Sequence, residues 1–560
     1  MPPAFSKEEI KAEGKRPKRK VAVLIGYSGT GYKGMQLDYS QKTIEGDLFS
    51  AFVAAGAISK ANADDPKKSS FVRCARTDKG VHAAGNVISL KLIIEDRDIV
   101  DKINSNLSPQ IRVWGILRTT GSFSCYQACD SRWYEYLIPT HSFLPPHPSS
   151  FLGKSTLELA EETDDLDGYN ERQKEVLSFW QDAEEKYIKP ILASLDSESR
   201  VLVEKALYGK SSSFEQIEGP EEDEDDEIAL ENEADGYKVA AQAPSGKGPK
   251  PEKTADEEVN RNKNKTAASD QSVCKDDRAV LATTTTTQSH TISNNSLDKT
   301  IGSVRQAYIA AKRAYRISPE RLARVQDVFS RYCGTQNFHN YTTRKSPRDP
   351  SAKRHIKSFT VSSTPIIIGD TEWVSLKVHG QSFMMHQIRK MVGMAALVVR
   401  CGCVPSRIDE SLKEDVIAIP KAPGLGLLLE RPVFDSYNEK AASQFDRETI
   451  DFNKYRKEVD EFKMREIYER IFREEERDDV FHNFFGHVDN FKDPAFLYVS
   501  SKGLKACGPP RAVSTAQPPP SRSERKMLAK KRDWRGSQDN LDAENRAKNG
   551  ATEDQSATGT

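Results

Sequence analysis

The chain has 560 residues, of which 37% are hydrophobic and 30% charged, and its 83 basic and 83 acidic side chains give a formal net charge of zero. This length suits two or three domains, but so polar a composition indicates that a sizeable part is disordered. The sequence has no apolar run of the ~18 residues that span a membrane, no paired CxxC knuckles of a zinc ribbon and, at its start, no apolar secretory signal. The balanced charge excludes no class of partner, because acids cluster in the middle and bases at both ends.

Two basic clusters lie near the ends of the chain. Residues 1–20 form an arm that ends in KRPKRK (Lys15–Lys20), and SERKMLAKKRDWR (Ser523–Arg535) lies in a tail, 505–560, of low apolar content. Each cluster alone suits a nuclear import signal, an RNA-binding tail or a solvated charge run. Because both occur in ends that we expect to be disordered, we predict that the protein acts in the nucleus.

Residues 21–140 are predicted to form a compact α+β half. Buried strands are expected at 21–27, 71–75, 86–94, 111–117 and 132–138, and helices at 43–56 and 98–107. Successive strands that follow one another directly indicate hairpins, and therefore a largely antiparallel sheet rather than a doubly wound one.

A connector and an insert follow this half, and an extension comes later. Residues 141–210 have the amphipathic pattern of helices. Residues 211–300 contain the run EEDEDDE (Glu221–Glu227) and hardly any aromatics, which predicts a disordered acidic insert. Its acids could compete with RNA for a basic groove, a hypothesis that deletion of the insert would test. Residues 436–504 are dense in charge and predicted to be mainly helical.

Residues 301–435 repeat the theme of the first half. A helix is expected after Ser318, its N-cap, a hairpin over 356–380 turns at Gly369, and 383–400 has the pattern of a long buried helix. The predicted fold class is therefore α+β, with two similar antiparallel-sheet halves that carry helices on one side.

The GTGYKG run (Gly29–Gly34) matches a dinucleotide-binding pattern and follows a strand. That fold needs a helix to open at once within a parallel βαβ unit, whereas here the next helix begins near Thr43. We interpret the run as a glycine-rich bend where another stretch of backbone comes close. The Cys401-Gly-Cys403 pair has no neighbouring histidine pair, which favours ordinary buried thiols over metal ligands.

Asp78 lies in a short polar loop between two strand-like runs, in the stretch ARTDKGVHA (Ala75–Ala83). An aspartate before a glycine is commonly a turn residue. Here Arg76 is close enough in sequence to pair with it and hold it ionised, and rigid strands support the loop, as at many catalytic sites. The sequence offers no second carboxylate at glycosidase spacing, no Ser-His-Asp order and no metal cluster. If the loop is catalytic, its chemistry depends on one acid.

Six motifs together carry a resemblance to a known family. They are, in chain order, YSGTGYKGMQ (Tyr27–Gln36), TIEGDL (Thr43–Leu48), ARTDKGVHA (Ala75–Ala83), SRWYEYLIP (Ser131–Pro139), FMMHQIRKMVG (Phe383–Gly393) and PKAPGLGLLL (Pro420–Leu429). Over residues 21–140 and 320–435 the chain resembles the tRNA pseudouridine synthase A family. The acidic insert, the extension and the basic ends resemble the eukaryotic multisite branch of that family.

The resemblance implies isomerisation of uridine to pseudouridine in tRNA, at several sites that include the anticodon stem-loop. The C–N glycosidic bond is broken, the base turns and C5 is joined to C1′, which requires no redox cofactor, metal or nucleotide. Asp78 is the implied catalytic residue, either as a nucleophile at C1′ or as a base that removes the C2′ proton. An RNA uracil glycosylase and a non-catalytic tRNA-binding or chaperone protein on the same fold are the alternatives.

Other roles follow from the family motifs. Tyr134 is expected to stack on the target uracil, Arg389 to pair with Asp78 from an otherwise apolar helix, and Arg76 to occupy the place of the displaced base. For His82 a structural hydrogen bond is expected rather than catalysis. Tyr126 stands where bacterial members have an arginine, so this position offers no second basic contact to the RNA.

The resemblance further implies phosphate and shape recognition by basic side chains along an RNA-binding cleft between the two halves. The candidates at its mouth are Arg19, Lys20, Lys33 and Lys79. Small nuclear RNA and mRNA are further candidate substrates, and no membrane partner is expected. Because the extension could cover the surface through which bacterial relatives dimerise, we expect a monomer.

Overall fold

The structure is a computed structural model that describes residues 5–197, 200–201, 203 and 294–507. The acidic run Glu221–Glu227 and the basic cluster Ser523–Arg535 lie outside these residues, as do most of the predicted insert and tail. In the described part, no helix has both the length and the apolar content needed to cross a membrane.

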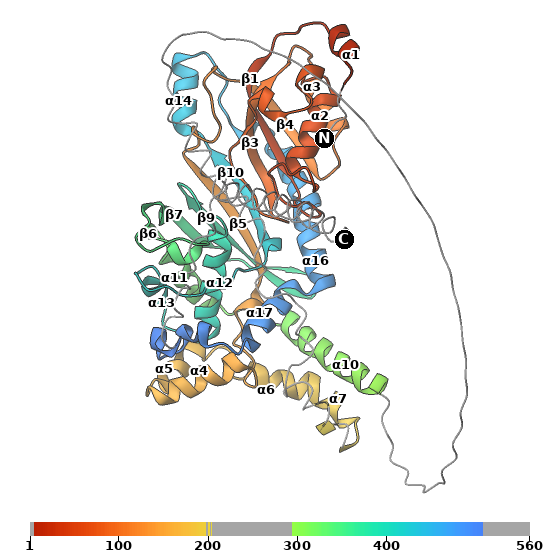
Figure 1. Cartoon of the computed structure of the whole chain (residues 1–560). Coiled ribbons are helices and arrows are strands. Elements are labelled where there is room, and N and C mark those ends of the chain that lie inside the picture. The colour runs from red at the N-terminus through yellow and green to blue at the C-terminus, as the bar shows by residue number, and fades with distance from the viewer. Residues whose placement is uncertain (1–4, 198–199, 202, 204–293, 508–560) are drawn as a thin grey trace, which may run out of the picture.

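One sheet of ten strands forms the centre of the described molecule (Figure 1). The strands are β1 (Arg19–Tyr27), β2 (Val72–Arg73), β3 (His82–Leu92), β4 (Ile111–Arg118), β5 (Ser131–Pro139), β6 (Gly334–Asn337), β7 (Lys353–Val361), β8 (Ile366–Ile368), β9 (Thr371–Gly380) and β10 (Leu427–Val433). Their order is β4-β1-β3-β10-β5-β9-β7-β6, with β2 on β3 and β8 on β9. Only β10 and β3 pair in parallel among the described strands. The predicted α+β class is confirmed, and the two halves are joined in one sheet.

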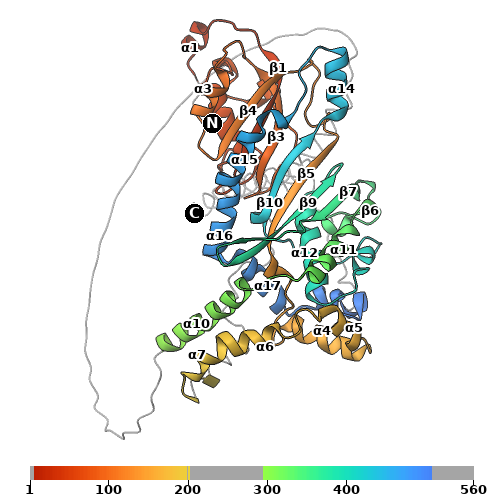
Figure 2. The same ribbon diagram turned by 180° about the vertical axis from the view of Figure 1, so that it is seen from behind.

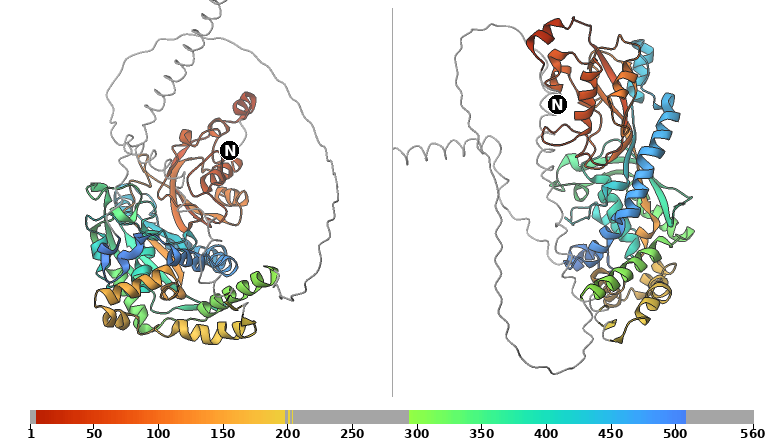
Figure 3. Two further views of the ribbon diagram at one scale, coloured as in Figure 1. Left: turned by 60° about the horizontal axis from the view of Figure 1, so that its bottom comes forward. Right: turned by 90° about the vertical axis from the view of Figure 1, so that its right-hand side faces the viewer.

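Helices of the two halves cover one face of this sheet, and those of the extension cover the other (Figure 3). The face covered by helices of the two halves is called the front face here. It carries α2 (Ile44–Ala54), α3 (Ile99–Ser105), α11 (Pro319–Ser330) and α12 (Gln387–Arg400). The opposite, back face is covered by the extension and carries α14 (Asp435–Gln444), α15 (Arg456–Phe462) and α16 (Glu469–Asp478). Alternation along β1 separates the two cores, because Val21 and Val23 pack toward α2 whereas Ala22 and Leu24 pack toward the extension.

The remaining helices lie mostly at the end of the molecule away from β1 (Figure 2). They are α4 (Phe151–Glu162), α5 (Leu166–Gln173), α6 (Phe179–Ala183), α7 (Lys189–Ala193), α10 (Asn294–Arg313), α13 (Arg407–Ser411) and α17 (Val480–Asn490). The described part of the connector is thus helical, and α10 begins within the range predicted as insert.

Residues 5–20 differ from the disordered arm that the sequence predicts. Helix α1 (Lys7–Ala12) begins with a capping box in which the Glu9 N–H donates to Ser6 Oγ at 3.2 Å. Arg16 then donates to the Gly56 carbonyl at 2.9 Å. The basic charge of this segment suggested disorder, but these contacts with the end of α2 hold it against the sheet domain.

Two glycines let the extension lie close to the back of the sheet. A Cβ atom at Gly115 would lie 2.1 Å from the Tyr455 hydroxyl, and one at Gly85 would lie 2.8 Å from the Phe452 ring. Any side chain at these positions would hold the extension away from the strands, so the glycines are part of its docking surface.

A buried ion pair anchors the C-terminal end of α12. The Arg400 side chain is 2% exposed; it donates to the Asp489 carboxylate at 2.7 Å and lies 4.5 Å over the Phe485 ring. It also donates to the Ser142 carbonyl at 3.4 Å. One side chain therefore joins α12, α17 and the segment that follows β5.

Arg400→Met is expected to lower the free energy of unfolding by ~3–5 kcal/mol, because it leaves the Asp489 carboxylate buried without its partner charge. The double variant Arg400→Met, Asp489→Leu should recover part of this loss, since it removes both charges. Denaturant unfolding followed by circular dichroism measures both values.

The matched control is Arg477→Met, which breaks an exposed pair with Asp478 and should leave stability unchanged. An Arg400→Met variant as stable as this control would contradict the anchoring role of the buried pair.

Candidate active site

Strand β10 brings the predicted site residues together. Leu428 and Leu429 pair in parallel with His82 and Ala83 at the start of β3. Leu429 also lies opposite Tyr134 of β5. The Asp78 loop runs directly into β3, so it lies beside Tyr134 and beside the segment that precedes β10.

The backbone of the Asp78 loop is fixed by hydrogen bonds on both sides. Thr77 Oγ1 lies 2.9 Å from the Tyr27 hydroxyl, and the Thr77 carbonyl accepts from the Met35 N–H at 3.1 Å. The Asn86 amide donates to the Ala75 carbonyl at 3.0 Å. Because the partners belong to buried strands and to the loop before α2, the carboxylate of Asp78 is presented on a rigid support.

The GTGYKG run is a close-approach bend, as interpreted from the sequence. A Cβ atom at Gly29 would lie 2.3 Å from the Val81 carbonyl oxygen, and one at Gly34 would lie 2.9 Å from the Thr77 carbonyl oxygen. The Gly29 N–H donates to His82 Nδ1 at 3.1 Å. Burial lowers the pKa of His82 to about 4, so its ring is neutral and serves to hold the bend.

Asp78 contacts two side chains at the N-terminal end of α12. His386 Nδ1 lies 2.8 Å from Oδ2, and Arg389 Nη1 lies 3.8 Å from the same oxygen. Arg389 is itself held, because its Nε donates to the Ala422 carbonyl at 2.7 Å. The Asp78 side chain keeps 27% of its surface exposed, so it is only partly covered by these contacts.

The surroundings of Asp78 keep it ionised. Burial alone would raise the pKa of this carboxyl, but the hydrogen bond from His386 and the electrostatic influence of His386, Arg389 and Lys421 outweigh that effect. The net pKa is therefore below the ordinary value of an aspartate. Near neutral pH the side chain is a carboxylate that can act as nucleophile or base.

Tyr134 is near enough to Asp78 to feel its charge and is 8% exposed. Its ring meets that of Phe383 edge to face, with centroids 5.2 Å apart. Burial, opposed only in part by the Arg132 charge, raises the pKa of Tyr134, so the phenol stays protonated and can donate a hydrogen bond.

Arg76 lies two residues before Asp78 and its side chain is exposed. Its charge acts on the Glu45 carboxyl, whereas the side chains that the structure describes in contact with Asp78 come from the N-terminal end of α12. Sequence proximity suggested that Arg76 pairs with Asp78. The contacts with Asp78 that the structure describes come instead from residues of the other half. Tyr126, at 65% exposure, lies on the loop between β4 and β5.

A pocket of about 360 Å³ opens beside the Asp78 loop. Its lining residues are Thr30, Gly31, Tyr32, Lys33, Lys79, Gly80, Leu425 and Glu474. Two of the predicted basic candidates, Lys33 and Lys79, are therefore beside the Asp78 loop. Arg19 and Lys20 are not, because they lie at the opposite end of β1, where Arg19 faces Leu92.

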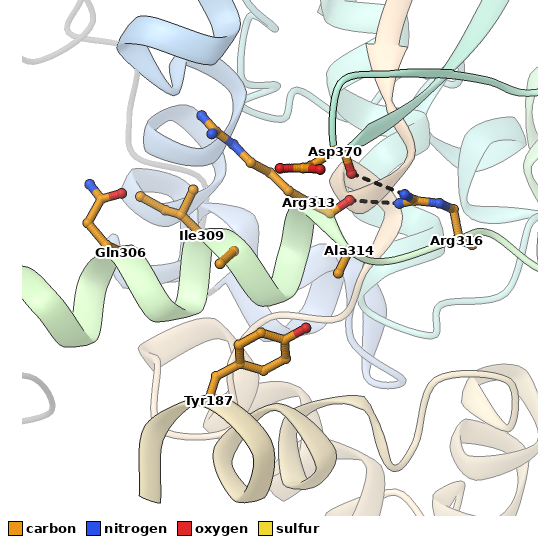
Figure 4. A pocket seen from close by; sticks show the side chains of 8 residues that line it. Tyr187, Gln306, Ile309, Arg313, Ala314, Arg316 and Asp370 are labelled. Carbon is orange, nitrogen blue, oxygen red and sulfur yellow. Dashed lines mark hydrogen bonds between the residues drawn. The ribbon is translucent and has the colours of Figure 1, made fainter. Parts of the chain in front are cut away.

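A second pocket, of about 390 Å³, lies between α10 and the connector (Figure 4). It sits near Asp370, at the far end of β9 from the residue that pairs with Tyr134. Its arginines are engaged within the protein, since Arg313 lies 2.9 Å from the Asp479 carboxylate and Arg316 donates to the Asp370 carbonyl at 3.2 Å. We place the chemistry at the Asp78 carboxylate, whose neighbours Lys79 and Gly80 line the smaller pocket.

The cysteine pair noted in the sequence lies apart from the site. Cys401 and Cys403 are both buried, and burial raises the pKa of each thiol. Within the described ranges, no group of three or more His, Cys, Asp or Glu side chains could hold a metal ion.

Comparison with known proteins gives a consistent result. A sequence model described as tRNA pseudouridine synthase matches residues 328–435. The tRNA pseudouridine synthase 1 of Yarrowia lipolytica is 43% identical over 498 residues, which cover 88% of this chain and 79% of the relative. That of Schizosaccharomyces pombe is 40% identical over 509 residues, 89% of this chain and 88% of the relative. The chain belongs to the tRNA pseudouridine synthase family.

The family includes a more distant relative, the tRNA pseudouridine(27/28) synthase of Saccharomyces cerevisiae, which is 32% identical over 473 residues, 84% of this chain and 100% of the relative. The matched range 328–435 contains α12 and β10, and the longer alignments extend the likeness over most of the chain. Both halves of the candidate site thus lie in a tRNA pseudouridine synthase framework.

Of the described contacts with Asp78, sequence reasoning missed the shortest, that of His386. The signal was present, because this histidine lies three residues before Arg389 in the motif FMMHQIRKMVG. The sequence pattern predicts one helix over 383–400, which would include His386. In the structure α12 begins only at Gln387, so His386 lies just before the helix.

Gly29→Ala is expected to destabilise the protein by ~1–3 kcal/mol, because the new Cβ would collide with the Val81 carbonyl and force the bend away from the Asp78 loop. Gly14→Ala is the control, since no atom lies within 4 Å of a Cβ built there. Denaturant unfolding of both variants measures the effect, and equal stability would disprove the close approach.

Proposed function

We propose that this protein isomerises uridine to pseudouridine in tRNA, at several sites that include the anticodon stem-loop, and that Asp78 is its catalytic carboxylate. The observation that carries the proposal is the contact of Arg389 with Asp78, with Tyr134 near enough to feel the Asp78 charge, so that three distant parts of the sequence come together at one carboxylate. Membership of the tRNA pseudouridine synthase family supports both the reaction and the substrate.

The reaction needs little beyond one acid group and a held base. The bond between N1 of the uracil and C1′ of the ribose breaks, C5 forms a new bond to C1′, and the proton that leaves C5 is balanced by one gained at N1. Asp78 can attack C1′ and form a transient ester, or it can remove the C2′ proton. The ionised state of Asp78 suits both routes.

The neighbours of Asp78 have complementary roles in this proposal. Tyr134 is proposed to stack on the flipped uracil, and its protonated phenol suits proton transfer at C5. Arg76, exposed at the rim, can enter the stack in place of the displaced base. Arg389 holds the carboxylate in its charged form.

Substrate binding is proposed to depend on basic side chains that contact phosphates, with Lys33 and Lys79 nearest to the carboxylate. Small nuclear RNA and mRNA are proposed as additional substrates, recognised by shape rather than by sequence. We further propose that the protein is a nuclear monomer. The two basic clusters of the sequence support the nuclear location, and the extension on the back of the sheet supports the monomer.

Asp78→Ala is expected to lower pseudouridine formation in a tRNA transcript below ~1% of the wild-type rate, because the proposed reaction depends on this one carboxylate. It should bind tRNA with unchanged affinity, since phosphate contacts lie elsewhere. Pseudouridine mapping and filter binding measure the two quantities. Asp98→Ala is the control, because that carboxylate is exposed and caps no helix by its side chain.

The same assay separates the two alternatives. An RNA uracil glycosylase would release free uracil and leave an abasic site, and a binding or chaperone protein would leave the uridines unchanged. Wild-type activity in Asp78→Ala would refute the assignment of the catalytic carboxylate.

A further inference from the structure

We propose that His386 is the positioning residue of the catalytic carboxylate: its Nδ1–H holds Oδ2 of Asp78 and leaves Oδ1 to act on the ribose of the flipped uridine. This inference rests on the function proposed above and adds to it the side chain that selects the reacting oxygen. The contact joins the C-terminal half to the catalytic loop of the N-terminal half.

The geometry of the contact assigns the two carboxylate oxygens to different tasks. An ionised carboxylate only accepts hydrogen bonds, so His386 Nδ1, at 2.8 Å from Oδ2, is the donor. Arg389 Nη1 approaches the same oxygen, at 3.8 Å. Both side-chain contacts that the described residues make with this carboxylate therefore go to Oδ2. The His386 side chain is 6% exposed, whereas Asp78 keeps 27% of its side-chain surface exposed, so the carboxylate is not closed off by the histidine that holds Oδ2.

The backbone of His386 gives a second, independent observation. Its φ is 59° and its ψ is 0°, a left-handed conformation that is rare for residues other than glycine. It occupies the N-cap position of α12 but makes no side-chain capping bond. Such a conformation costs of order 1–3 kcal/mol and commonly marks a functional position. Here it turns the imidazole away from the helix end and toward Asp78.

Several groups around Asp78 influence its pKa, and His386 differs from the others in donating a hydrogen bond to the carboxylate. Arg389 comes from the same helix, Lys421 from the segment before β10 and Tyr134 from β5. The hydrogen bond from His386 is the strongest influence that lowers the pKa of Asp78, while burial opposes it. Loss of this donor therefore raises the pKa of Asp78. Because the reaction needs the ionised form, the acid limb of the activity profile should move to higher pH.

The test compares His386→Asn with His386→Leu. The Asn Nδ2–H can replace the imidazole Nδ1–H, whereas Leu fills similar space without a donor. For His386→Leu we expect kcat to fall about 10- to 100-fold, KM for a tRNA transcript to stay within about twofold, and the acid limb of kcat to move upward in pH. His386→Asn should retain most of kcat and the wild-type acid limb.

Thermal unfolding and filter binding of the same variants show whether fold and RNA affinity are intact. Wild-type kcat and an unshifted acid limb in His386→Leu would overturn the proposal. Equal losses of kcat in His386→Asn and His386→Leu would overturn it too, because they would indicate a packing role. If the wild-type protein itself forms no pseudouridine, the proposed function fails, and that outcome is distinct from both.

Discussion

The active site depends on one pairing arrangement, the insertion of β10 between β3 and β5. In this position Leu428 and Leu429 contact β3 on one side and β5 on the other. The Asp78 loop, Tyr134 and the N-terminal end of α12 come within reach of each other only because this strand lies among them. The motif PGLGLLL therefore has a structural task, since it closes the sheet and places the segment that holds Arg389 through the Ala422 carbonyl.

Successive side chains of β5 point to opposite faces of the sheet, so this strand contributes both to the site and to the contact with the extension. Tyr134 points to the site, and the next residue, Glu135, points to the extension, where it lies 2.9 Å from Lys463 Nζ and accepts from the Tyr468 hydroxyl at 2.5 Å. The extension thus supports the sheet from behind the site without entering it, apart from Glu474, which lines the pocket beside the Asp78 loop.

Features that depend on neighbouring residues could be predicted from the sequence. The Asp78 loop between strands, the Ser318 N-cap and the hairpin turn at Gly369 follow from local spacing and turn chemistry, and the structure contains all three. Features that depend on distant residues could not be predicted from spacing alone. The pattern of residues 383–400 cannot show that His386 leaves the helix, because the contact that favours its left-handed conformation comes from Asp78. The motif carried over from the family supplied Arg389, but no local rule marks the parallel pairing of β10 with β3.

The position of β10 also bears on how the protein is made. During synthesis, β3 leaves the ribosome hundreds of residues before its partner, so its edge near His82 and Ala83 stays open until residues 427–433 are available. Open strand edges invite pairing with other chains, and contacts of such high sequence separation form slowly. Chains that stop before β10 would lack the site and present an unpaired edge. Folding of the N-terminal half is therefore a step at which protection against aggregation matters most.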